Sequence, residues 1–115
     1  MALIKCDKHG ETGFMPFVSK ELSKRIESGE HIKHDDISWI DVLLIDDEDG
    51  EILQEIRYWM STSFFNSISA LKKYRILTEH DEKEVDRILS PIIKGGGCCG
   101  KCFDEQTDKI RLKAQ

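Results

Sequence analysis

Four residues near the two ends of the chain have the side chains and the spacing of metal ligands. Cys6 and His9 are separated by two residues near the start, and Cys99 and Cys102 by two residues near the end. Cysteine thiolates and histidine nitrogens are the usual ligands of a structural zinc ion, which takes four of them in a tetrahedron. We therefore predict one structural zinc ion bound by Cys6, His9, Cys99 and Cys102.

The first half-site carries a recognisable local motif. Cys6-Asp-Lys-His9-Gly10 resembles the zinc knuckle of zinc-ribbon proteins, which typically reads Cys-x-x-Cys-Gly and sometimes has histidine in place of one cysteine. The second half-site departs from that pattern, because Phe103 rather than glycine follows Cys102. Most ribbons keep their two knuckles within a few tens of residues. Here nearly the whole chain separates them, so the metal is expected to join the two ends of the domain.

Other interpretations of the cysteines compete with a zinc site. Cys98, Cys99 and Cys102 could form a thiol redox cluster, since Cys-x-x-Cys is the motif of thioredoxin-like proteins. A disulfide set, an iron–sulfur ligand set and unliganded thiols are further alternatives. The two-residue spacing favours Cys99 over Cys98 as the zinc ligand, which leaves Cys98 as a bystander or a reactive thiol.

The expected ligand set argues against catalysis at the metal. A catalytic zinc keeps one position open for water, whereas three cysteines and one histidine fill all four. The deaminase pattern is absent, because Gly10 follows His9 directly and no proline precedes Cys99. The sequence also has no phosphate-binding glycine loop and no nucleophile-elbow serine, so we do not expect an enzyme.

Two other polar clusters have a simpler interpretation. His31 and His34 have a spacing that could serve a metal, but no second ligand pair accompanies them, so we expect a solvated loop. The acidic run at 46–51 lacks the register of a calcium loop, since its glycine would place Ile45 where the first carboxylate belongs. We expect a charged turn there, able to contact a basic partner.

The charge balance bears on the kind of partner. The chain has 22 acidic and 17 basic residues and a net charge of −5, which argues against general nucleic-acid binding. It favours a basic protein partner, because complementary charge speeds and orients association. We expect a small zinc-binding protein–protein interaction module, for instance a neutralising partner of the immunity or antitoxin type. The alternatives are a thiol redox protein and a zinc-ribbon-type nucleic-acid-binding regulator that uses its locally basic C-terminal end.

Two features of the chain bear on its compartment. No run approaches the ~20 apolar residues of a membrane-spanning helix. Residues 1–6 also lack the basic and apolar regions of a secretory signal. A cytoplasmic location with reduced thiols is therefore the expectation.

Hydrophobic periodicity indicates an α+β fold in which about three helices accompany a central antiparallel β-hairpin. Apolar residues on both faces of the first hairpin strand predict a central strand covered twice, and Asp49-Gly50 predicts its turn. Ser19 and Thr78 are expected to cap helices, Thr78 in a capping box with Asp81. The expected strands are 2–5, 13–18, 37–46 and 51–60, and the expected helices are 20–28, 63–74 and 79–90.

These elements place the two half-sites at the ends of one unit. We expect a single domain over 1–103 and a polar C-terminal tail over 104–115. The three glycines of 94–97 are expected to form a flexible approach to the metal site. Trp59 is expected in the core if a helix covers its strand face, and otherwise as an exposed binding anchor.

Overall fold

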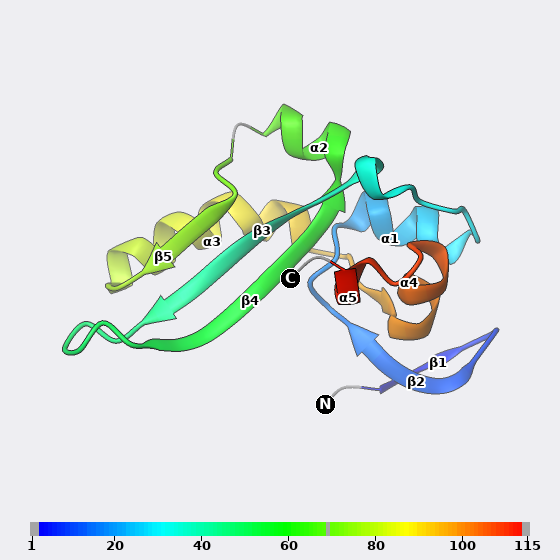
Figure 1. The fold of residues 1–115 in the computed structure, drawn as a ribbon, viewed down its shortest axis with the longest axis horizontal. Helices are drawn as coiled ribbons and strands as arrows, with labels where there is room; N and C mark the ends of the chain where they lie inside the picture. The colour runs from blue at the N-terminus through cyan, green and yellow to red at the C-terminus, as the bar shows by residue number, and fades with distance from the viewer. Residues whose placement is uncertain (1–2, 69, 114–115) are drawn as a thin grey trace.

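The larger of two sheets is built on the strand with the strongest apolar pattern. The computed structural model describes residues 3–68 and 70–113, drawn in Figure 1. In it β3 (Ile37–Ile45) is the central strand of a sheet with the order β4-β3-β5. β4 (Ile52–Ser61) pairs with β3 in antiparallel fashion, and β5 (Lys73–Ile76) pairs with it in parallel. The expected β-hairpin and the α+β class are therefore confirmed.

β3 contributes side chains to a core on each of its faces, as predicted for a central strand. Ile40 and Val42 are buried in one core, together with residues of α3 (Glu79–Ile93). Ile37 and Trp59 belong to a second core on the opposite face of the sheet. Because Trp59 is only 4% exposed, it is a core residue and not an exposed anchor.

Helix α3 begins where the sequence predicts. The Thr78 hydroxyl accepts a hydrogen bond from the Asp81 N–H, and the Asp81 carboxylate accepts one from the Thr78 N–H, both at 3.2 Å. This is the expected capping box, which satisfies two N–H groups at the start of the helix. The helix runs to Ile93 rather than ending at 90, and in doing so it buries Ile92 against the sheet.

The helix expected over 63–74 is wrong in its second half. Ser61 caps a short helix, α2 (Thr62–Ser67), and the chain then forms the edge strand β5. The side chains of β5 alternate between exposed and half-buried, with Tyr74 packed on the core. Leu71, expected on the apolar side of a long helix, is 64% exposed. Pairing with β3 and the packing of Tyr74 and Ile76 on the core outweigh the local helical pattern here.

The smaller sheet joins the two ends of the chain. It has the order β1-β2-β6 and consists of β1 (Leu3–Cys6), β2 (Gly10–Met15) and β6 (Cys98–Cys99), all antiparallel. The strand expected over 13–18 thus lies three residues earlier, because the β1–β2 register begins with Cys6 opposite Gly10. Val18 instead forms an isolated bridge to Trp59 and so connects the small sheet to β4.

Helices at both ends of the chain cover the small sheet. Ser19 caps α1 (Lys20–Glu27) as predicted, its hydroxyl accepting from the Leu22 N–H at 3.2 Å. α4 (Gly100–Gln106) and α5 (Ile110–Lys113) follow β6. The described chain therefore contains five α-helices rather than about three, since the last two begin beyond the clear periodic pattern.

The segment after residue 103 contributes buried residues to the fold. α4 continues without a break past Phe103, which is fully buried. Thr107 is also fully buried, and Ile110 is 4% exposed in the core that contains Trp59. Residues 104–113 therefore pack with the rest of the fold, and residues 114–115 lie outside the described part.

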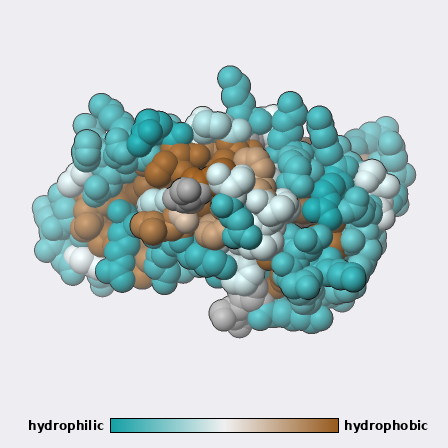
Figure 2. Space-filling model, turned by 90° about the horizontal axis from the view of Figure 1, so that it is seen from above, coloured by the Kyte–Doolittle hydropathy of each residue, from teal (hydrophilic) through white to brown (hydrophobic). Residues whose placement is uncertain are grey.

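The two cores differ in how completely they are covered. Seen from above in Figure 2, apolar side chains gather at the surface over α2 and β5, whereas the half that contains the terminal helices is mainly hydrophilic there. This agrees with the core beneath α3, where partly buried residues outnumber buried ones. Among the described residues, no helix is long and apolar enough to cross a bilayer.

Candidate metal centre

The first half-site is the turn between β1 and β2. Cys6 is the last residue of β1, and Gly10, with φ +70°, begins β2. This positive φ suits glycine and lets the chain turn tightly enough to direct backbone N–H groups at the Cys6 sulfur. The N–H of Lys8, then the His9 side chain, lower the pKa of Cys6 to about 6. The predicted knuckle therefore favours a thiolate at Cys6.

The second half-site lies where β6 passes into α4. Cys99 ends β6 opposite Phe14 of β2, and Cys102 lies in the first turn of α4. Burial opposes ionisation of Cys99, but the Thr12 hydroxyl at 2.9 Å and the backbone N–H groups of Cys102 and Lys101 outweigh it and lower the pKa of Cys99. Pairing of β6 with β2 is what brings this half-site to the first one.

The glycines before the second half-site pack closely against the start of α1. They do not form the flexible segment expected there. A Cβ atom on Gly96 would lie 2.2 Å from the Val18 carbonyl oxygen, closer than atoms can approach. The Gly97 N–H donates to the Ser23 hydroxyl at 2.8 Å and to the Val18 oxygen at 3.1 Å. The glycines are therefore needed because the backbone passes directly against the start of α1.

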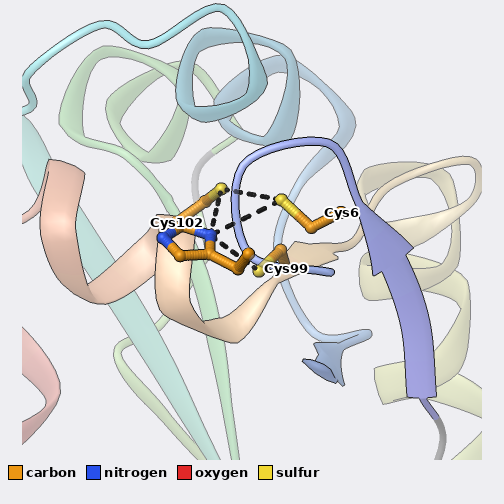
Figure 3. A group of neighbouring side chains, drawn as sticks. Cys6, Cys99 and Cys102 are labelled. Atoms are coloured by element: carbon orange, nitrogen blue, oxygen red, sulfur yellow. Dashed lines mark hydrogen bonds between the residues drawn. The ribbon is translucent and has the colours of Figure 1, made fainter. Parts of the chain in front are cut away.

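The two half-sites form a single four-residue cluster. The Sγ atoms of Cys6, Cys99 and Cys102 and a ring nitrogen of His9 all lie within 4.8 Å of one another. His9 Nδ1 is 3.5 Å from the sulfurs of Cys6 and Cys102 and 3.7 Å from that of Cys99. Figure 3 shows the three thiols converging on one point. The structure thus brings all four predicted residues together, and together they can hold one metal ion.

The electrostatics of the cluster favour a bound cation. Burial, followed by hydrogen bonds with the Cys6 and Cys99 thiols and by the negative charge of those thiols, raises the pKa of Cys102 to about 12. A divalent cation removes that penalty, since each ligating thiol is then deprotonated against the positive charge.

Glu105 orients the histidine. Its carboxylate lies 2.8 Å from His9 Nε2, on the side of the ring away from the cluster. The Glu105 hydrogen bond, followed by that of Cys6, raises the pKa of His9 to about 9. When His9 is neutral, a proton held on Nε2 by Glu105 leaves the Nδ1 lone pair directed at the thiols, as in carboxylate–histidine–metal arrangements. Sequence reasoning missed Glu105, although its place one helical turn after Cys102 is a signal that could have suggested it.

Removing the Glu105 carboxylate is expected to weaken metal binding. We expect Glu105→Ala to lower the affinity about 10- to 100-fold, the usual effect of losing such an orienting group. Competition with a chromogenic chelator measures this. Glu82→Ala, which removes an exposed carboxylate from α3, should leave the affinity unchanged. Equal affinities in the two variants would show that Glu105 does not orient the ligand.

The other residues singled out in the sequence lie outside the cluster. Cys98 is 1% exposed within the apolar core, and burial raises its pKa to about 12. His31 contacts Asp108 at 2.7 Å, and His34 contacts the Thr107 carbonyl at 2.8 Å. In the described part of the chain neither histidine belongs to a metal-binding group.

The fold and the site together define a small α+β protein whose chain ends are joined by a Cys3His cluster able to hold a metal ion. A comparison with protein families, curated proteins and solved structures finds no match to this chain.

Proposed function

We propose that the cluster binds one structural zinc ion and that the domain it closes is a protein–protein interaction module. The cluster geometry carries the first half of this proposal. Bonds of about 2.3 Å to sulfur and about 2.0 Å to nitrogen at tetrahedral angles place ligand atoms about 3.5–3.8 Å apart. His9 Nδ1 lies 3.5 to 3.7 Å from the three sulfurs, and the sulfurs of Cys6 and Cys102 are 3.5 Å apart, so these four of the six separations lie close to that spacing.

The ligand set supports a structural rather than a catalytic ion. Three thiolates and one imidazole fill a tetrahedron, which leaves no position for a reacting water. The ligands also come from β1, the β1–β2 turn, β6 and α4, so one ion ties together elements from both ends of the chain. Metal binding of this kind is coupled to folding.

The hairpin turn supports the second half of the proposal. Glu48 and Glu51 have backbone N–H groups held by Asp46 and Asp49, at 2.8 and 2.9 Å, so the turn has a defined shape. Within the described chain, none of the carboxylates of 46–51 has an ion-pair partner. Leu53 beside the turn is 67% exposed. An acidic turn next to exposed apolar side chains suits a partner with a basic surface.

Native mass spectrometry and affinity capture test the two halves separately. The purified chain should carry one zinc ion that a strong chelator removes. In affinity capture the chain should also recover a basic partner protein. That recovery should be lost when Asp47, Glu48 and Asp49 are replaced by Asn, Gln and Asn. A folded chain without metal under reducing conditions would refute the structural zinc. Capture that is unaffected by the neutralised turn would refute the interaction surface.

The alternative of a thiol redox protein using Cys98, Cys99 and Cys102 has less support. Cys98 is enclosed by core residues, and its raised pKa disfavours the thiolate that redox chemistry requires. Titration of thiols with a labelling reagent, with and without chelator, distinguishes the two functions, because bound zinc slows the labelling of its ligand cysteines and a chelator then speeds it.

A further inference from the structure

Two of the thiols in the cluster lie close enough to form a disulfide with each other after a small movement. Cys6 Sγ and Cys102 Sγ are 3.5 Å apart, although the residues are 96 positions apart in the chain. A disulfide has a sulfur–sulfur distance of about 2.0 Å, so a movement of roughly 1.5 Å would join them. Cys6 is the last residue of β1, before the β1–β2 turn, and Cys102 lies in the first turn of α4.

The cluster is also accessible from one side. An open depression of about 420 Å³ is lined by Cys6, Cys99 and Cys102 together with residues of β1 and the β1–β2 turn and with Glu27 of α1. Cys6 is half-buried, whereas the other cysteines are buried. Cys6 is therefore the cluster cysteine most open to a small oxidant that enters this depression. Cys98 does not line the depression.

We propose that a peroxide oxidant converts Cys6 and Cys102 from metal ligands into a disulfide, which replaces the ion as the link between β1 and α4. This inference rests on the structural zinc proposed above and adds a way in which the site is regulated. The domain would then exist in two closed forms, one held by the ion and one held by a covalent bond between the same two segments.

The chemistry balances with hydrogen peroxide as the oxidant. The Cys6 thiolate attacks one peroxide oxygen, the O–O bond breaks, and a sulfenic acid forms while hydroxide leaves and takes a proton to become water. The Cys102 thiolate then attacks the Cys6 sulfur, the S–S bond forms, and the second oxygen leaves as hydroxide, which a second proton converts to water. The two thiolates together lose two electrons, and these electrons reduce one peroxide to two waters.

Loss of two ligands accounts for release of the ion. After oxidation only His9 and Cys99 remain available, and two ligands do not complete a tetrahedral site. The new bond still joins β1 to α4, so the two ends of the chain stay together. Oxidation is therefore expected to remove the metal without opening the domain.

Titration of the zinc-loaded chain with hydrogen peroxide tests the proposal. A chromogenic chelator reports released zinc, and peptide mapping under non-reducing conditions identifies the disulfide. We expect one zinc released per peroxide consumed, a Cys6–Cys102 link, unchanged far-UV circular dichroism, and rebinding of zinc after reduction. The variant Cys98→Ala should behave identically, because Cys98 has no part in the exchange.

Several results would overturn the exchange. These are retention of zinc at excess peroxide, a disulfide that contains Cys98 or Cys99, or unfolding that accompanies release. Failure of the zinc proposal itself is distinguishable, because the chain purified under reducing conditions would then contain no zinc before any peroxide is added.

Discussion

Replacing Cys99 by serine is expected to abolish stoichiometric zinc binding and to unfold the half of the molecule that contains both chain ends. Structural zinc contributes on the order of 10 kcal/mol to small domains that depend on it, whereas a whole domain is stable by only about 5–15 kcal/mol. Cys99 is also the point where β6 pairs with Phe14 of β2, so its loss affects the small sheet directly. Metal analysis and far-UV circular dichroism measure the two effects.

The neighbouring cysteine supplies the matched control. Cys98→Ala removes a thiol that is buried in the core but lies outside the cluster. That variant should keep one zinc ion and lose stability only by the small amount expected for trimming one buried side-chain atom. If Cys99→Ser retained zinc and a cooperative unfolding transition while Cys98→Ala did not, the ligand assignment at this half-site would be wrong.

The second large effect is expected at Trp59. Its ring lies 5.3 Å from the rings of both Trp39 and Phe103, so it packs between the large sheet and α4. The backbone of Trp59 also forms hydrogen bonds with both neighbours of Val18. The Trp59 N–H donates to the Phe17 carbonyl, and the Trp59 carbonyl accepts from the Ser19 N–H, each at 2.8 Å. Trp59→Ala should destabilise the domain by about 3–5 kcal/mol, because a large cavity opens in the core.

Urea unfolding in excess zinc measures this loss without confusing it with loss of metal. Leu53→Ala is the control from the same strand, since Leu53 is 67% exposed and its truncation should change stability by less than about 0.5 kcal/mol. Similar midpoints for the two variants would mean that Trp59 does not join the sheet to the terminal helices. Zinc content should stay at one ion per chain in both variants.

Much of the fold follows from local patterns. The apolar run of β3, the turn at Asp49-Gly50 and the caps Ser19 and Thr78 each act within a few residues, so they could be predicted directly. β5 could not be predicted in this way. Its sequence is compatible with a helix, and it becomes a strand through pairing with β3, about thirty positions earlier in the chain.

The same division holds at the metal centre. Ligand types and two-residue spacings are local, and they were sufficient to select Cys6, His9, Cys99 and Cys102, which the structure brings within one cluster. The sequence does not indicate that Glu105 lies against His9, or that Cys98 lies in the core while Cys99 faces the cluster. Those outcomes depend on the pairing of β6 with β2 and on the direction of α4, which arise only when segments distant in the chain pack together. Local chemistry thus specified which side chains can bind a metal, and long-range packing specified which neighbours tune, bury and expose them.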